Sequence, residues 1–442
     1  MPMKLRRQLG LAEAAGLSLS IVAPTMAMAF NVTLVVGAAG QAAPLAFAIG
    51  TLLLALVGLS FVAFAKRETS AGSAQAYISR HFGHRAGFLA GWVLLLSYLC
   101  FGSGTAVLVG NFLATAIRPL GLPVEALWAP ISIASIGISL FLSWRNVQIA
   151  ARLMLALELI SMVAIVVLGV NILSTVAQAG PLPLTPFRPD PAMGWSGIGL
   201  ALVFTVLSFA GFESATTLAE ETRNPLRAIP LAVLGTVLFA GIFYVFAAYA
   251  EVVGYGAEGM GNLAKDSAPL DTLARRYGSP ALATALNLAA ALSAFSCVLG
   301  SMNAAARMTM VLARNGNHPL ANIHAERGTP TTALMISASI MTTGILLWAV
   351  WVGAGAYYGF IGTIGTLALI LVYMGVTGAH AITAWSAARY VKFITGLLGT
   401  GVLLWPMYNS LYPVPNWPNN LWPYVVLIWG LAGIVAARLY RG

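Results

Sequence analysis

The sequence predicts an all-helical integral membrane protein with about twelve membrane-spanning helices. Hydrophobic residues make up 59% of its 442 positions and charged residues only 8%, whereas roughly a quarter of the residues in a soluble domain are charged. A bilayer needs about 20 apolar residues for each helical span. A transmembrane barrel would alternate polar and apolar positions, but runs such as 153–176 are apolar on every face. Helical spans therefore fit this sequence, and a barrel does not.

Apolar runs separated by polar breaks define the expected spans. The first six cover residues 13–38, 43–65, 86–117, 127–144, 152–176 and 195–220. The second six cover residues 229–253, 281–312, 331–352, 356–384, 392–411 and 420–438. The connection 254–280 carries both charge signs and a helical stretch at Pro269–Tyr277, which we expect to lie outside the spans, at the membrane surface.

The distribution of basic residues predicts the orientation of the chain, because cytoplasmic loops carry the excess of Lys and Arg. With the N-terminus inside, only five of the 23 Lys and Arg residues fall on the outer side, namely Arg118, Arg188, Lys265, Arg275 and Arg276. Both termini are therefore expected in the cytoplasm, and the protein is expected in a plasma membrane of the bacterial inner-membrane type. The net charge of +10 is explained by these loops and by lipid headgroups, so no nucleic-acid partner is expected.

The composition argues against an enzyme and against a metal site. Cys100 and Cys297 both fall inside apolar runs, and the five histidines are dispersed, so no metal and no other cofactor is expected. The first apolar run lacks a small-residue cleavage site and leads into further spans, so we expect a retained helix and not a cleaved signal peptide. No sequence pattern indicates an oligomeric state.

Two of the spans contain a break in the helical pattern. Pro24 lies inside the first span and has no backbone N–H to donate, and Gly211 lies beside Glu213 inside the sixth. Such residues can also be simple kinks, but the first and sixth positions are where an inverted repeat of five helices plus five places its discontinuous pair. Exposed N–H groups at such a break bind a carboxylate, and exposed C=O groups bind an ammonium group or a sodium ion.

The residues around the sixth span resemble those of a known family. The strings are Phe-Ala-Gly-Phe-Glu at 209–213 and Ala-Glu-Glu-Thr-Arg-Asn-Pro-Leu-Arg-Ala-Ile-Pro at 219–230, followed by Asn-Ala-Ala-Ala-Arg at 303–307 and Ala-Arg-Asn-Gly-Asn-His-Pro at 313–319. In these strings the sequence resembles the amino acid-polyamine-organocation transporter superfamily. The resemblance implies a leucine-transporter-type fold: a five-helix repeat over 1–178, a second, inverted repeat over 192–388, broken helices 1 and 6, and two C-terminal helices over 389–442.

The resemblance also implies a substrate site between the two broken helices. It places a carboxylate pocket at Ala23, Pro24, Thr25, Met26 and Ala27, and an amine pocket at Phe209, Ala210 and Gly211. Many relatives carry a glycine-rich stretch where this chain reads Ala-Pro-Thr-Met-Ala. Phe212 is expected as a wall or gate of the site, with further contacts from Tyr98, Ser293 and Ser296.

Glu158 and Glu213 are the carboxyl residues well inside the expected spans, where an ionisable group is costly and marks function. We expect both to take part in coupling transport to a proton, with sodium as the alternative ion. A packing role for Glu158 stays open, and Glu213 is expected to titrate, to pair with an amine, or to hydrogen-bond the freed N–H groups of the first span. The charged residues Glu220, Glu221, Arg223 and Arg307 are expected at an inner gate, with a solvated loop face as the alternative.

These patterns favour a secondary active transporter of small amino-acid-like solutes that works as a proton symporter by alternating access. A sodium-coupled carrier or an exchanger of amino acids, amines or polyamines is the close alternative. A membrane-embedded sensor is a remote one, because no added cytoplasmic domain is visible in the sequence. An enzyme would need a convergent cluster of His, Cys or carboxylates, and a channel would not need paired breaks.

Overall fold

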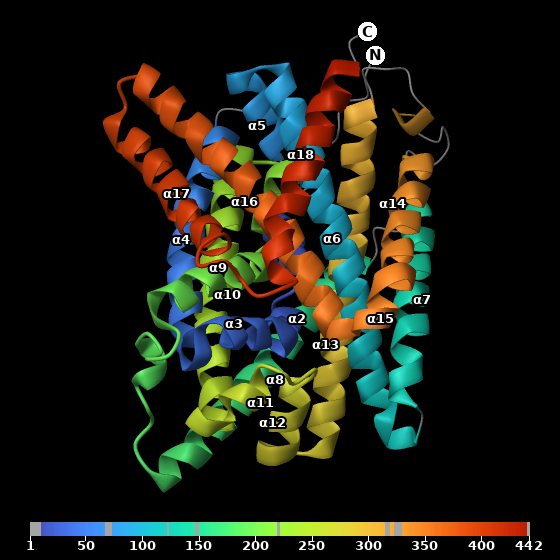
Figure 1. The fold of residues 1–442 in the computed structure, drawn as a ribbon, viewed down its shortest axis with the longest axis vertical. Coiled ribbons are helices and arrows are strands. Elements are labelled where there is room, and N and C mark those ends of the chain that lie inside the picture. The colour runs from blue at the N-terminus through green and yellow to red at the C-terminus, as the bar shows by residue number, and fades with distance from the viewer. Residues whose placement is uncertain are drawn as a thin grey trace.

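The computed structural model describes residues 10–66, 73–121, 123–145, 150–218, 222–313, 319–321 and 329–439, and within these ranges it consists of helices, turns and loops without a strand. Glu220 and Glu221 of the expected inner gate lie outside the described residues. The long helices stand together as one bundle (Figure 1). They are α4 (Ala43–Ala65), α6 (His84–Ile117), α7 (Val124–Trp144), α8 (Ala150–Ala179), α10 (Pro225–Tyr255), α13 (Pro280–Ala313), α14 (Thr331–Gly344), α16 (Ala354–Ser386), α17 (Tyr390–Asn409) and α18 (Trp422–Leu439).

The all-helical membrane architecture predicted from the sequence is confirmed. In the described part of the chain, ten helical stretches are long and apolar enough to cross a membrane. One of them, Ala14–Ala65, contains the first two expected spans, and the sixth expected span corresponds to the shorter helix α9 (Gly194–Ser208). The ten stretches and α9 together therefore account for all the spans that the sequence predicts.

The first span is divided into two helical parts at Ala23 and Pro24. Helix α1 (Leu11–Val22) ends at Ala23, which has a left-handed backbone with φ 51° and ψ 61°. The chain then continues through α2 (Pro24–Met26), a π-helical turn η1 (Ala27–Asn31) and α3 (Val32–Ala39). Pro24 has no N–H and its ring obstructs the preceding turn, so it suits the first position of the second part. We call residues 23–27 the first break.

The sixth span is divided in a similar way. Helix α9 ends at Ser208, and after Gly211, whose φ is 100°, the chain forms a 3₁₀ helix η5 (Phe212–Leu218). The sequence predicts a break at Gly211 inside the span 195–220, and the structure confirms it: the α-helix ends before Gly211, whose backbone is left-handed. We call residues 209–213 the second break.

Short helices lie at both ends of the bundle. Helix α5 (Ser73–Phe82) lies at one end, and α11 (Met260–Leu263) and α12 (Pro269–Tyr277) lie at the other (Figure 1). The predicted helical stretch in the longest connection is thus confirmed by α12. The remaining short elements are η2 (Gly40–Ala42), η3 (Arg118–Leu120), η4 (Thr185–Phe187), η6 (Ala257–Gly259), η8 (Pro319–Ala321), the π turn η9 (Ile345–Ala349), α15 (Val350–Val352) and η10 (Asn419–Leu421).

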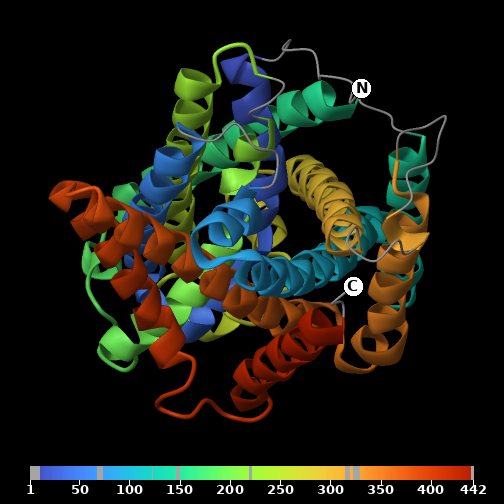
Figure 2. The ribbon, with the colours of Figure 1, turned by 90° about the horizontal axis from the view of Figure 1, so that it is seen from above.

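The core of the bundle is formed by the helices that surround the two breaks. Helices α6, α10 and α13 have long buried faces and pack against α16, α4 and α6 respectively. The C-terminal helices α17 and α18 lie at the periphery, where they are coloured orange and red in Figure 2, and most of their apolar side chains are exposed. Helices with so many exposed apolar side chains are suited to contact with lipid.

Candidate functional site

The end of α1, directly before the first break, lies against the second break. A methyl group at Gly211 would overlap the side chain of Ile21, two residues before the first break. The hydroxyl of Ser18 on α1 donates to the carbonyl of Phe212 (3.0 Å) and accepts from the N–H of Ala215 (3.0 Å). The end of α1 is therefore fixed to the second break and the start of η5.

The freed backbone donors of the first break bind side chains from two other helices. In an uninterrupted helix, the N–H groups of Thr25 and Met26 would donate to carbonyls four residues earlier. Here the N–H of Thr25 donates to Oε1 of Glu158 on α8 (2.6 Å), and the N–H of Met26 donates to Oγ of Ser293 on α13 (3.2 Å). Glu158 is only 4% exposed. The carboxylate predicted as a coupling group thus lies at the pocket predicted for the substrate carboxylate.

The same rearrangement leaves carbonyl oxygens at the end of α1 without their usual helical donors. The donors four residues on would be Pro24, Thr25 and Met26, and these have no N–H or donate elsewhere. The affected carbonyls belong to Ser20, Ile21 and Val22. Carbonyl groups at the C-terminal end of a half-helix carry partial negative charge and favour a cation.

The second break is also held by a buried carboxyl group. The hydroxyl of Tyr373 on α16 donates to Oε2 of Glu213 (2.7 Å). Tyr98 of α6 lies close enough to Glu213 to interact with it electrostatically. One of the roles expected for Glu213, hydrogen bonding to the freed N–H groups of the first span, is wrong, because the N–H of Thr25 donates to Glu158 instead.

A polar network beyond the first break was not predicted from the sequence. Asn31 donates from Nδ2 to Oγ of Ser208 (2.9 Å) and accepts at Oδ1 from the hydroxyl of Tyr358 (2.8 Å). The hydroxyl of Tyr244 donates to the carbonyl of Ser208 (2.7 Å), which is the last residue of α9. A lone Asn in an apolar run was the available signal, because membrane helices rarely bury an amide without a partner.

The aromatic residues of the second break pack into the bundle. Phe209 is fully buried against Tyr244, with ring centroids 4.9 Å apart. Phe212 is equally buried and meets Phe61 and Tyr373 edge-on, at centroid distances of 5.9 and 5.6 Å. The role of Phe212 as a wall or gate stays a prediction.

The serines expected on the eighth span lie on α13 near Glu158. Ser293 accepts the hydrogen bond from Met26, and Ser296 is buried one turn further along. Together with Glu158 and Ser161 of α8 they line a small cavity of about 20 Å³. Such a volume holds about one water molecule or one ion.

The described part of the expected inner gate lies on the surface. Arg223 precedes α10 and Arg307 lies in the last two turns of α13, and both side chains are exposed. Their expected pairing with Glu220 and Glu221 stays a prediction.

The buried carboxyl groups have no buried Lys or Arg as a partner among the described side chains. Every Lys and Arg whose side chain the structure describes is exposed, whereas Glu158, Glu213 and Glu251 are buried. Buried Asp271 is paired with the exposed Arg275 at 2.7 Å, away from the breaks on α12. A buried charge needs a partner or a proton, so the carboxyl groups at the two breaks favour a cation from outside the chain.

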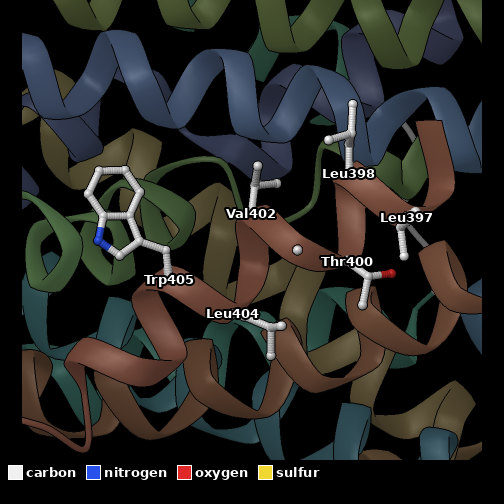
Figure 3. Close-up of a pocket in the computed structure, with 7 residues that line it drawn as sticks. Leu397, Leu398, Thr400, Val402, Leu404 and Trp405 are labelled. Carbon is white, nitrogen blue, oxygen red and sulfur yellow. The ribbon is translucent and has the colours of Figure 1, made fainter. Parts of the chain in front are cut away.

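An apolar groove with a volume of about 530 Å³ lies on α17. Figure 3 shows its lining side chains, which carry no charge. They are Leu397, Leu398, Thr400, Gly401, Val402, Leu404 and Trp405. This groove has no group suited to an ammonium or a carboxylate, and it lies on a peripheral helix that suits contact with lipid.

The chain is similar to known transport proteins. A family model described as amino acid permease matches residues 17–397. The branched-chain amino acid permease BcaP of Lactococcus lactis is 27% identical over 353 residues, which cover 74% of this chain and 72% of the relative. The methylthioribose transporter of Bacillus subtilis is 24% identical over 429 residues (91% and 86%), and the low-affinity putrescine importer PlaP of Escherichia coli K12 is 28% identical over 253 residues (56% and 54%).

Proposed function

Because the chain belongs to the amino acid permease family, we propose that it is a secondary transporter that carries a small amino-acid-like solute by alternating access. The contact between the end of α1 and the second break supports this proposal, since broken helices at membrane depth line a site and do not face lipid. The relatives are named as carriers of branched-chain amino acids, of putrescine and of methylthioribose. We expect the solute of this protein to be of similar size and polarity. We place the protein in a bacterial plasma membrane with both termini in the cytoplasm.

We propose that transport is coupled to protons through Glu158 and Glu213. The observation that carries this proposal is that each carboxyl is buried at one break, where Glu158 accepts from the N–H of Thr25 and Glu213 accepts from the hydroxyl of Tyr373. A hydrogen bond to an ionised acceptor is roughly twice as strong as one to a neutral acceptor. Gain or loss of a proton at either carboxyl therefore changes how firmly a break is held, which links proton binding to the movement of the broken helices.

Replacing Glu158 by glutamine should uncouple uptake from the proton gradient. Glutamine keeps an oxygen that accepts from the N–H of Thr25, but it cannot take up or release a proton. If one proton moves with each solute, a gradient of one pH unit drives about a tenfold accumulation of solute inside the vesicle. The variant should lose this accumulation but should still let the solute reach equal concentrations on both sides of the membrane. The measurement is uptake of labelled amino acids and amines into proteoliposomes without sodium, with and without an inward proton gradient.

The matched control is Glu258→Gln, which removes an exposed carboxyl from the connection after α10 and should leave accumulation unchanged. Proton-driven accumulation that survives Glu158→Gln at full strength would remove Glu158 from the coupling mechanism. Uptake that ignores the proton gradient in the unaltered protein would remove proton coupling altogether.

A sodium-coupled carrier is the second candidate, and the small cavity beside Glu158 favours it. The cavity offers oxygen atoms from Glu158 and three serines in a volume suited to one ion. Uptake that requires sodium and does not respond to the proton gradient would select this candidate.

A further inference from the structure

The first break offers no free backbone donor to a bound anion. Pro24 has no N–H, the next two N–H groups donate to Glu158 and Ser293, and the N–H of Ala27 donates to the carbonyl of Ala23 at 3.0 Å. This accounts for every donor in the first turn of the helical run 24–39. The position where a solute carboxylate would bind the broken helix is therefore occupied by Glu158 and Ser293 of the protein itself.

Most backbone donors of the second break are bonded within the chain as well. The N–H groups of Phe209, Ala210, Phe212 and Ser214 donate to carbonyls two or three residues earlier in the same segment, and the N–H of Ala215 donates to Ser18. Each break thus contains one carboxyl of the protein, and the first break has no free donor for another.

We propose that Glu158 acts as an internal substitute for the carboxylate of an amino acid, so that the solute carried by this protein is an organic amine without a carboxylate group. This inference rests on the proposed transport function and specifies its substrate class. A solute carboxylate would have to displace Glu158 from the N–H of Thr25 and remain beside it in the apolar interior. Two like charges in such a place repel each other strongly, and neither finds a buried Lys or Arg among the described side chains.

An amine, in contrast, finds acceptors on both sides of the break. The carbonyl oxygens of Ser20, Ile21 and Val22 lack their usual helical donors, as described above. The carboxyls of Glu158 and Glu213 add negative charge, and the Lys and Arg side chains that the structure describes are all exposed. An ammonium group donates three hydrogen bonds and carries the charge that these groups need.

The test compares solutes that differ only in the carboxylate group. The pairs are putrescine and ornithine, cadaverine and lysine, and isoamylamine and leucine, each measured as a competitor and as a labelled solute with the full-length protein in proteoliposomes. In at least one pair, the amine should bind at least about tenfold more tightly than its amino acid, which is the scale of one hydrogen bond to a charged group. An amino acid that binds as tightly as its amine, or more tightly, in every pair would overturn the inference.

Two variants of Glu158 distinguish two ways in which this residue could exclude a solute carboxylate: by occupying the N–H of Thr25, or by charge repulsion alone. Glu158→Ala frees the N–H of Thr25, so the affinity for the amino acid should rise roughly tenfold or more relative to the affinity for its amine. Glu158→Gln removes the charge but still occupies the N–H of Thr25, so the ratio of the two affinities should change much less. An equal gain in both variants, or none in Glu158→Ala, would contradict the proposed role of Glu158.

The outcomes also separate this inference from the proposed function. Transport of amino acids with no preference for amines would leave a permease in place and refute the inference alone. Failure of the reconstituted protein to bind or carry either member of any pair would count against the transport function itself, and the inference would fall with it.

Discussion

Replacing Gly211 by alanine should abolish transport and destabilise the protein. The backbone of Gly211 has φ 100°, a conformation that costs a residue with a Cβ atom about 1–3 kcal/mol. The added methyl group would also overlap the side chain of Ile21, and overpacking of this kind costs about 1–3 kcal/mol. Ile21 has little room to move away, because it also packs close to Gly300 on α13, where a methyl group would lie only 3.0 Å from its Cγ1 atom. The measurements are the uptake rate in proteoliposomes and the midpoint of thermal unfolding in detergent.

The matched control is Gly235→Ala on α10, where a methyl group would meet nothing within 4 Å. This variant should transport like the unaltered protein. Combining Gly211→Ala with Ile21→Ala removes the overlap but not the backbone strain, so it should restore only part of the stability. Normal transport by Gly211→Ala would mean that the close contact between the end of α1 and the second break is not needed for function.

The fold could be predicted from the sequence because lipid imposes one strong requirement. Every backbone group at membrane depth needs a partner, so each long apolar run had to be a helix. The helix at Pro269–Tyr277 was also predictable, since it begins with Pro and carries acidic and basic residues near its two ends. Gly211 likewise marked the break of the sixth span, but its contact with Ile21 could not be predicted from the sequence, since the two residues lie on different helices.

The candidate site could be predicted only in part. The cost of burying a carboxylate drew attention to Glu158 and Glu213, and Pro24 marked the first break. Their partners are distant in the sequence: Thr25 lies 133 residues from Glu158, and Tyr373 lies 160 residues from Glu213. Apolar periodicity gives no information on such pairs, since it locates helices but not which of their faces meet.

The two carboxyl groups help to maintain both breaks at membrane depth. A break frees backbone donors, and each buried donor without a partner costs roughly 1–3 kcal/mol. Glu158 reaches the first break from α8, and Glu213 accepts from Tyr373 of α16 at the second. Because an ionised acceptor binds these donors more strongly than a neutral one, the groups that stabilise the breaks are also suited to respond to a proton or to a cationic solute.

Replacing Glu213 by alanine should therefore have an effect as large as that of Gly211→Ala. The variant leaves the buried hydroxyl of Tyr373 without its acceptor and empties the space of a buried side chain. An unpaired buried donor costs roughly 1–3 kcal/mol and truncation of a buried side chain to alanine costs about 2 kcal/mol or more, so the expected destabilisation is about 3 kcal/mol or more, and uptake should fall below detection. Thermal unfolding in detergent and uptake in proteoliposomes measure the two effects separately.

Conservative variants distinguish the hydrogen bonds of Glu213 from its charge. Glu213→Gln keeps an acceptor, so it should lose much less stability than Glu213→Ala while losing proton-driven accumulation, and Tyr373→Phe should cost about one hydrogen bond, roughly 1 kcal/mol. Glu258→Ala, at an exposed carboxyl of the connection after α10, is the control and should change neither quantity. If Glu213→Ala melts and transports like this control, the second break does not depend on its carboxyl. If Glu213→Gln keeps full proton-driven accumulation, the proton is carried elsewhere, and Glu158 becomes the single carboxyl at the breaks on which coupling depends.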